Sequence, residues 1–235
     1  MSMTAPAIRL RKPGGPDALT LETVEVGDPG SGEVRLRQTA VGLNYIDVYH
    51  RDGRYPLSYP SGIGLEAAGV VEAVGPDVDD LVVGDRVAYA FPPIGAYAAK
   101  RIAPAAILIK IPESISDETA AAMMLQGLTA QYLLRRTYRV GAGDVILVHA
   151  AAGGVGLILC QWAKALGATV IGTVGSEEKA ALAKANGAAH TILYRTESIL
   201  DRVKEITGGA GVPVVYDSIG KTPSTPRSIA SAPWG

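Results

Sequence analysis

The chain has 235 residues, of which 48% are hydrophobic, and its formal net charge is −1. This apolar content is enough for one large or two ordinary globular domains. A near-neutral charge excludes strong attraction to a nucleic-acid backbone or to an anionic membrane, so neither partner is expected. Arg135, Arg136 and Arg139 form the one local basic run. We interpret it as a solvated helix face, with RNA binding as the alternative.

Cysteine usage and the N-terminal sequence predict a cytoplasmic protein. Cys160 is the single cysteine, which excludes an intramolecular disulfide and a thiolate zinc cluster and is typical of a reducing compartment. The N-terminus lacks the apolar segment of a secretion signal. Residues 145–163 are apolar enough to suggest a membrane span. However, the Gly153-Gly154 pair and Gln161 interrupt them, which favours a buried strand, a turn and a buried helix.

Residues 1–124 are predicted to form a compact, mostly antiparallel β domain. Val34, Leu36 and Gln38 alternate with polar residues, so they are expected to share one face of a strand. Turns rich in glycine and proline separate the strand-like runs, which are residues 7–11, 19–26, 33–41, 67–74 and 85–90.

The pattern changes near residue 116, where Ser116 opens a helical stretch that a second helix, from about 125 to 136, follows. Strands and helices then alternate strictly. The strands are 145–149, 169–174, 190–194 and 213–217, and the helices are 154–166, 177–186 and 197–206. This order predicts right-handed βαβ units and a parallel sheet. The fold class is therefore α/β, with a Rossmann-type domain over residues 125–235.

A glycine-rich turn joins the first strand of this domain to its first helix. Gly153, Gly154, Val155 and Gly156 would bring backbone N–H groups and the positive end of the helix dipole close to a pyrophosphate. Gly156 would also let the helix pack against the sheet. Because the turn lies at the first of three strand-to-helix crossovers, it predicts dinucleotide binding, and a purely structural turn is the alternative.

The end of the second strand of the domain favours NADP(H) over NAD(H). An acidic residue there would bind the ribose 2′-hydroxyl of NAD and repel a 2′-phosphate. This strand end is neutral, Ser176 can cap the next helix, and Lys179 lies one turn along it. The alternative is an ordinary capped helix with Glu177 and Glu178 in its first turn.

Several motifs resemble the medium-chain dehydrogenase/reductase superfamily. Segments 42–56, 64–75 and 84–89 look like its chaperonin-10-like (GroES-like) catalytic domain. Segments 125–138, 149–168 and 214–220 are similar to its quinone oxidoreductase (zeta-crystallin-like) branch. The zinc alcohol dehydrogenases of this superfamily have a cysteine in place of Asn44 and a His-Glu pair in place of Leu65-Glu66. Neither Asn44 nor Leu65 is an ordinary zinc ligand, so a zinc-free enzyme is expected.

The resemblance implies that NADPH is the cofactor and that a small-molecule quinone accepts its hydride. This step needs positioning and desolvation more than a strong acid. The expected substrate-side residues are Asn44, Asp47, Tyr49 and Tyr55; the two tyrosines are hydrogen-bond donors or, alternatively, a hydrophobic wall. The expected cofactor-binding residues are Thr129 for the nicotinamide and Gly153, Gly154, Val155 and Gly156 for the pyrophosphate. Ser176, Lys179 and Tyr194 are expected to bind the 2′-phosphate. Asp217 and Ser218 are expected to face the cofactor near the switch point, and the alternative for Asp217 is a strand-end cap only.

Members of the family continue beyond the position of Gly235, so the resemblance implies a chain that is truncated at its C-terminus. We expect it to lack the last Rossmann strands and the usual homodimer edge, and Pro223 and Pro226 disfavour a helix there. Two further readings stay open. One is NADPH-dependent reduction of an activated C=C bond in an enone or alkenal, and the other is a non-catalytic remnant.

Overall fold

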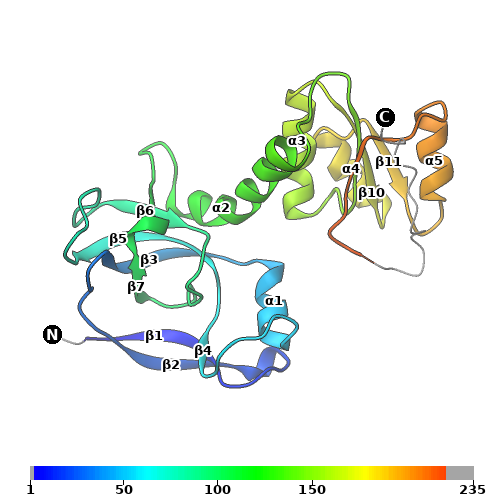
Figure 1. The fold of residues 1–235 in the computed structure, drawn as a ribbon. Helices are drawn as coiled ribbons and strands as arrows, with labels where there is room; N and C mark the ends of the chain where they lie inside the picture. Colours follow the sequence, from blue (N-terminus) through cyan, green and yellow to red (C-terminus); the bar gives the residue numbers. More distant parts are fainter. Residues whose placement is uncertain (1–2, 221–235) are drawn as a thin grey trace. The chain divides into compact units, whose positions relative to one another are not determined.

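The computed structural model describes residues 3–220, so the expectations for the tail with Pro223 and Pro226 lie outside it. The chain divides into two compact units, Met1–Leu125 and Gln126–Gly235. Figure 1 shows that strands dominate the first unit, whereas helices and strands alternate in the second.

The first unit contains two sheets, and their strands pair antiparallel, as the sequence predicts. The larger has the strand order β7-β3-β5-β6-β8, and the smaller has the order β2-β1-β4. The strands are β1 (Met3–Leu10), β2 (Leu19–Val26), β3 (Glu33–Gly42), β4 (Ser61–Gly62), β5 (Glu66–Val74), β6 (Arg86–Tyr89), β7 (Lys100–Pro104) and β8 (Ile109–Lys110), with short 3-10 turns η1 (Pro16–Ala18) and η2 (Ala105–Ile107). The short strands β4, β7 and β8 escaped prediction because each has few alternating apolar residues.

Strand β3 shows why the alternation identified this domain. Val34 and Leu36 are fully buried in the core of the larger sheet. Gln38 follows them inward, where its side-chain nitrogen donates to the carbonyl of Ala96 at 2.8 Å and its oxygen accepts from the hydroxyl of Tyr89. A polar side chain is stable at this position because both ends of its amide are hydrogen-bonded.

Helix α1 (Tyr45–Asp52) follows β3 and was not assigned from the sequence. Asn44 precedes it in an extended conformation, and its backbone N–H donates to the Asp47 carboxylate at 3.0 Å. Gly53 ends the helix with a φ of +84°, a conformation that side chains other than glycine's rarely adopt. These end signals, rather than an apolar stripe, define this short helix.

The second unit is a parallel four-stranded sheet with the order β11-β10-β9-β12. Its elements are β9 (Val145–Val148), α3 (Gly154–Ala165), β10 (Thr169–Val174), α4 (Glu177–Ala185), β11 (His190–Leu193), α5 (Ile199–Ile206) and β12 (Val214–Tyr216). The predicted α/β alternation is confirmed. The apolar run 145–163 is a strand, a glycine turn and a helix, and Cys160 is a buried core residue, as expected.

The expectation of two helices between residues 116 and 136 is wrong. A single helix, α2 (Asp117–Tyr132), leads into a short π-helical turn, η3 (Leu133–Thr137). Gly127 lies inside α2 and no proline interrupts it. A single glycine costs a helix only about 1 kcal/mol, and the alanine and methionine residues before it are strong helix formers.

An ion pair ties the start of α2 to β6, and we predict that Asp117→Asn destabilises the first unit. Arg86 donates to Asp117 through Nε at 2.9 Å and Nη2 at 2.6 Å, and the Thr39 hydroxyl donates to the same carboxylate at 2.6 Å. The hydrogen bond from Thr39, together with Arg86, lowers the pKa of Asp117. The charged form is therefore favoured in the folded state.

At pH 7 we expect a loss of about 2 kcal/mol, the usual contribution of hydrogen bonds to a charged group. A lowered folded-state pKa gives stability that is present above the unfolded pKa of about 4 and is lost as the pH falls through the folded value. The difference between variant and wild type in urea titrations should therefore shrink below pH ~4. Asp80→Asn, at an exposed carboxylate, is the control. An undiminished difference at acidic pH would contradict the assignment.

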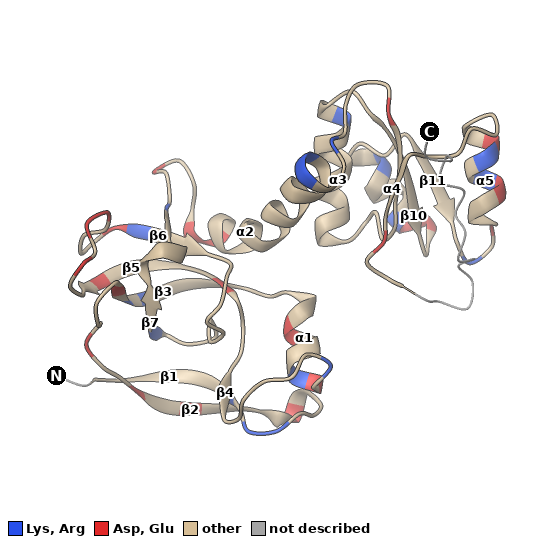
Figure 2. Ribbon diagram, viewed as in Figure 1, with Lys and Arg blue, Asp and Glu red and all other residues tan. Residues whose placement is uncertain are grey.

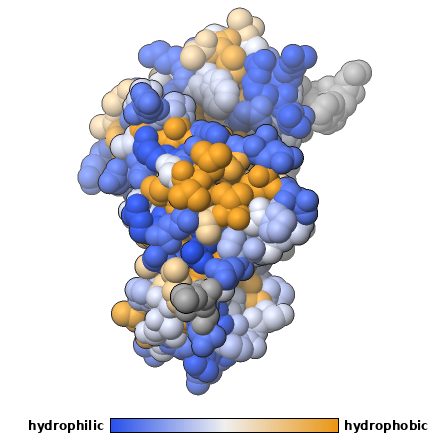
Figure 3. Space-filling model, turned by 90° about the vertical axis from the view of Figure 1, so that its left-hand side faces the viewer, coloured by the Kyte–Doolittle hydropathy of each residue, from blue (hydrophilic) through white to orange (hydrophobic). Residues whose placement is uncertain are grey.

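The surface mixes charges and apolar side chains. Figure 2 shows lysine and arginine interspersed with aspartate and glutamate, for example along α1 and α5. Figure 3 shows one face on which apolar side chains gather among hydrophilic ones. Large exposed apolar residues include Leu43, Leu21 and Tyr45. Among residues 3–220, no helix combines the length and apolarity needed to span a bilayer.

Candidate functional site

The glycine turn after β9 is held in place by the strands on both sides. The N–H of His149 donates to the carbonyl of Tyr216 in β12, and that of Ala151 donates to the carbonyl of Thr173 in β10. Gly153 donates to Ala150 at 2.8 Å. Because the sheet fixes both ends of the turn, its main chain is preorganised before any ligand binds.

Three N–H groups in the first turn of α3 are available to a ligand. Gly153 precedes the helix without a side-chain cap, and no residue in the described range accepts a hydrogen bond from Gly154, Val155 or Gly156. A Cβ atom on Gly156 would lie 2.3 Å from the carbonyl oxygen of Ala150. Gly156 therefore permits the helix to approach the turn, and the open amides with the helix dipole form an anion-binding cradle.

The side chain of Gln126 packs over this turn. A Cβ atom on Gly154 would lie 2.3 Å from the Gln126 Oε1 atom, so the glycine leaves room for a polar group beside the amides. Gln126 lies in α2, which also carries half-buried Thr129 one turn later. Sequence reasoning proposed Thr129 for the nicotinamide and did not single out Gln126.

Ser176 and Tyr194 lie together at the carboxyl end of β10. The Ser176 hydroxyl accepts from the N–H of Lys179 at 3.3 Å, so the predicted N-cap of α4 is confirmed. A Cβ atom on Gly175 would lie 2.7 Å from the Tyr194 hydroxyl. Lys179 is exposed in the first turn of α4. A serine, a phenol and a nearby lysine suit a phosphate monoester better than a ribose hydroxyl pair.

Asp217 and Ser218 follow β12 and are exposed. Asp217 Oδ1 accepts from the N–H groups of Ile219 at 2.8 Å and Gly220 at 3.1 Å, so this carboxylate caps the turn after the strand. Its role toward a cofactor stays a prediction.

His149 lies at the same strand edge, with Nδ1 2.8 Å from the Thr173 hydroxyl, and burial lowers its pKa.

In the first unit, Asn44 and Asp47 belong to a buried polar cluster around the start of α1. Asn44 Nδ2 donates to Glu66 Oε2 at 2.6 Å. Asp47 Oδ2 accepts from the Asn44 N–H and, at 2.8 Å, from the hydroxyl of Tyr97. Asn44, Asp47 and Glu66 are 8%, 3% and 1% exposed, so the cluster is shielded from bulk water.

Burial is the largest influence on the pKa values of the titratable groups in this cluster. It raises the pKa of both Asp47 and Glu66 above their usual values, against the hydrogen bonds that favour the charged forms. Burial also raises the pKa of Tyr97, and the Asp47 carboxylate beside its hydroxyl adds to the effect. His50 is buried one turn after Asp47, and desolvation lowers its pKa. Burial therefore opposes the charged forms of both carboxyl groups, and the hydrogen bonds within the cluster favour them.

Tyr49 and Tyr55 lie beside this cluster in an aromatic group. Their rings contact edge to face with centroids 5.4 Å apart, Tyr45 lies 5.2 Å from Tyr49, and the Arg54 guanidinium lies 5.2 Å above the Tyr49 ring. Tyr55 is 48% exposed. Such a surface can stack a planar ring, and it also fits the alternative role of a hydrophobic wall.

Sequence reasoning missed Glu66, Tyr97 and His50 as members of the polar cluster. Glu66 carried a readable signal, because a carboxylate stands at the head of the apolar strand sequence EAAGVV. Tyr97 and His50 carried none, since tyrosine and histidine are common both in cores and at surfaces.

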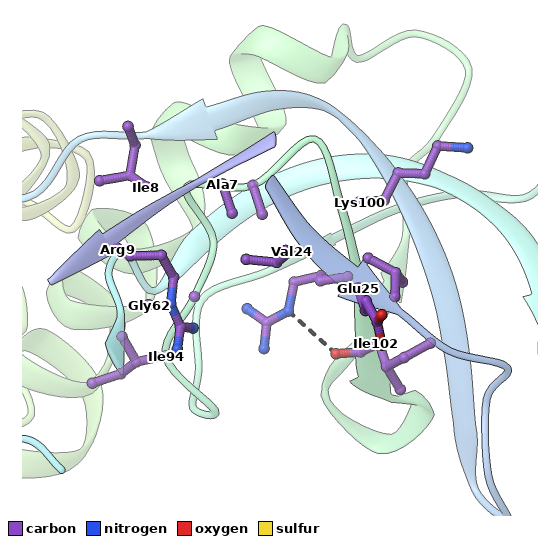
Figure 4. Close-up of a pocket in the computed structure, with 13 residues that line it drawn as sticks. Ala7, Ile8, Arg9, Val24, Glu25, Gly62, Ile94, Lys100 and Ile102 are labelled. Atoms are coloured by element: carbon purple, nitrogen blue, oxygen red, sulfur yellow. Dashed lines mark hydrogen bonds between the residues drawn. The ribbon is translucent and has the colours of Figure 1, made fainter. Parts of the chain in front are cut away.

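A pocket elsewhere in the first unit contains none of the predicted site residues. It has a volume of about 280 Å³ and lies between β1, β2 and β7, with Arg9, Glu25 and Lys100 on its walls (Figure 4). Arg101 in its wall is buried and donates to neutral acceptors, among them the carbonyl of Pro93 at 2.7 Å. This pocket is not part of the candidate site.

Each unit matches a known protein family. Residues 30–113 match the alcohol dehydrogenase GroES-like domain, and residues 154–232 match the zinc-binding dehydrogenase family. A 2-haloacrylate reductase from a Burkholderia species is 54% identical over 90% of this chain and 66% of its own length. The Pseudomonas aeruginosa quinone oxidoreductase is 54% identical over 88% of this chain and 64% of its own length.

The crystal structure of Escherichia coli quinone oxidoreductase complexed with NADPH matches with a TM-score of 0.90 and 49% identity, over 93% of this chain and 67% of that one. The chain thus spans about two thirds of the length of these relatives. A GroES-like unit followed by a Rossmann-like parallel sheet defines the medium-chain dehydrogenase/reductase class. Within that superfamily, the chain belongs to the quinone oxidoreductase family.

Proposed function

We propose that this chain contributes to an NADPH-dependent, zinc-free quinone reductase. The observation that carries the proposal is the preorganised turn before α3, where Gly154, Val155 and Gly156 present N–H groups that have no acceptor among residues 3–220. When bound, NADPH supplies a hydride from C4 of its nicotinamide. The relative crystallised with NADPH supports this cofactor.

In this proposal the second unit holds the cofactor. Gly153 and the three amides after it bind the pyrophosphate, and Thr129, Asp217 and Ser218 lie on the nicotinamide side. Ser176, Lys179 and Tyr194 bind the 2′-phosphate through a hydroxyl, an ammonium group and a phenol. The end of β10, buried Val174 followed by Gly175 and Ser176, supports this choice because an acidic residue at that strand end would repel a phosphate.

The first unit supplies the substrate-side residues Asn44, Asp47, Tyr49 and Tyr55. A quinone that accepts hydride becomes an already stabilised anion, so these residues mainly orient the ring and exclude water. Asn44 supports zinc-free chemistry because an asparagine amide is not an ordinary zinc ligand. A cytoplasmic location, in keeping with the single cysteine, belongs to the same proposal.

Reduction of an activated C=C bond is the second candidate. It is favoured by the 54% identity to a protein named 2-haloacrylate reductase, whose named substrate carries such a bond. Hydride addition to that bond needs the same cofactor site, so the two candidates differ only on the substrate side.

Titration of the purified chain with NADPH and, in parallel, NADH tests the proposal, read by quenching of tryptophan fluorescence. We expect saturable binding that prefers NADPH, followed by NADPH-dependent turnover of quinones. Stereospecific reduction of an enone with poor quinone turnover would favour the second candidate. A folded sample that binds neither cofactor would contradict the proposal and favour the non-catalytic reading.

A further inference from the structure

Glu66 is a fully buried carboxylate with no cationic partner within the described residues. It begins β5, is 1% exposed and forms no salt bridge among residues 3–220. Its two oxygens are used differently: Oε2 accepts from Asn44 Nδ2 at 2.6 Å, and Oε1 accepts from the backbone N–H of Leu125 at 2.8 Å. Burying an unpaired carboxylate is costly, so a hydrophobic residue would suit the fold better if packing were its only role.

The Glu66 carboxylate packs closely against Gly42. A Cβ atom on Gly42 would lie 2.2 Å from Glu66 Oε2 and 2.3 Å from the carbonyl oxygen of Ala121 in α2. Because Gly42 has no side chain, both the Glu66 carboxylate and the main chain of α2 can approach β3 at this position. Burial and the nearby Asp47 carboxylate raise the pKa of Glu66, whereas its hydrogen bonds oppose that rise. The hydrogen bonds thus hold one geometry against the unfavourable burial.

We propose that Glu66 is a positioning residue: its carboxylate fixes the Asn44 side chain through one oxygen and the main chain of α2 at Leu125 through the other. Asn44 opens α1, which carries Asp47 and Tyr49, and α2 continues from Leu125 to Gln126 and Thr129. One buried carboxylate thereby holds two segments that bear predicted site residues, one at Asn44 and the other at Leu125. This inference rests on the proposed function for its catalytic consequence.

Three variants test the hydrogen-bond pair directly. Glu66→Gln keeps an acceptor for the Leu125 N–H but turns an amide nitrogen toward Asn44. The two side-chain amide nitrogens, both donors, then face each other. Asn44→Asp places two carboxyl groups in contact. The double variant Asn44→Asp/Glu66→Gln restores one donor and one acceptor with the polarity reversed. We expect each single variant to lower kcat/KM for the quinone by about 10- to 100-fold, the range for small misplacements, mainly through kcat. The double variant should recover at least half of that loss on a logarithmic scale. Glu118→Gln, at an exposed carboxylate in the first turn of α2, is the matched control.

The Asn44→Asp variant has a pH signature that a simple packing defect would lack. The introduced carboxyl group and Glu66 should share one proton, as adjacent carboxyl groups do, and the shared proton replaces the lost amide hydrogen. Activity should therefore be highest at acidic pH and fall as the pair loses this proton. Among the described residues, Asp47 and Tyr97 interact electrostatically with Glu66, and His50 interacts with Asp47, whereas α2 contributes backbone amides. These three groups are present in the wild type, whose profile is the reference.

Hydrogen exchange separates this inference from the proposed function. The Leu125 amide should exchange at least about tenfold faster in Glu66→Ala than in the wild type, because its hydrogen bond to Glu66 is lost, whereas the amides of β9 should be unchanged. This result would support the positioning role even if the wild type reduced no quinone, an outcome that would reject only the proposed function. Unchanged Leu125 exchange, or a double variant no better than the worse single one, would overturn the inference.

Discussion

Gly156→Ala is expected to abolish useful NADPH affinity. The added Cβ would lie 2.3 Å from the carbonyl oxygen of Ala150 and 2.8 Å from the Cα atom of Ala151, distances that force the backbone to shift. Relieving such a clash costs about 1–3 kcal/mol of stability. It also moves the amides of Gly154 and Val155 away from the pyrophosphate. Losing about 3 kcal/mol of such hydrogen bonds corresponds to an affinity reduced ~100-fold.

Fluorescence titration of the variant with NADPH measures this loss, and circular dichroism reports whether the parallel sheet persists. Gly141→Ala in the same unit is the matched control, because a Cβ at Gly141 would meet nothing within 4 Å. We expect the control to bind NADPH as the wild type does. If Gly156→Ala bound NADPH with unchanged affinity, the pyrophosphate would not lie at this turn.

Ser176→Asp is expected to reverse the preference between the two cofactors. Aspartate caps helices as well as serine does, so the bond to the N–H of Lys179 and the start of α4 should persist. Its charge, however, would face the 2′-phosphate of NADPH. Two charges a few ångströms apart near a protein surface interact by several kcal/mol, so we expect NADPH affinity to fall about 100-fold. NADH lacks this phosphate, and a carboxylate can bind its ribose hydroxyl, so NADH affinity should stay constant or rise.

Parallel titrations with NADPH and NADH give the ratio directly, at low and at moderate salt because the repulsion is screened. Ser198→Asp provides a closely matched control. Ser198 caps α5 in the same unit, and its hydroxyl accepts from the N–H of Asp201 at 3.3 Å. The same substitution there should leave both affinities unchanged. Equal losses for NADPH and NADH in Ser176→Asp would place the 2′-phosphate elsewhere.

The cofactor half of the candidate site could be predicted because its signals are local. The turn from Gly153 to Gly156, the cap at Ser176 and the alternation of strands and helices each lie within a few consecutive residues. Such features depend on backbone geometry, which glycine content and periodicity reveal directly. The substrate half was predicted through Asn44 and Asp47, but the sequence did not reveal that these residues form one cluster with Glu66 and Tyr97.

The helix boundaries show a second limit of sequence reasoning. Helix α1 escaped notice because it is short and its buried residues are polar, namely Asp47 and His50. Helix α2 was predicted as two helices, the second beginning at about residue 125, whereas the structure has one helix that runs through Gly127. In both cases the helix is explained by local features, the end residues of α1 and the helix-forming residues of α2, that the apolar pattern does not report.

The sequence by itself determined the α/β class, the mostly antiparallel first unit, the parallel sheet expected of βαβ repeats and the glycine turn before α3. It did so because periodicity, turn residues and capping residues act over a few positions. Only the tertiary structure showed that Glu66 joins Asn44 to the main chain of α2 and that Gly42 makes room for this contact. Gly42 and Asn44 are neighbours in the chain, but Glu66 and Leu125 lie far from them and from each other. Their contact depends on the packing of β3, β5, α1 and α2, which no local pattern encodes.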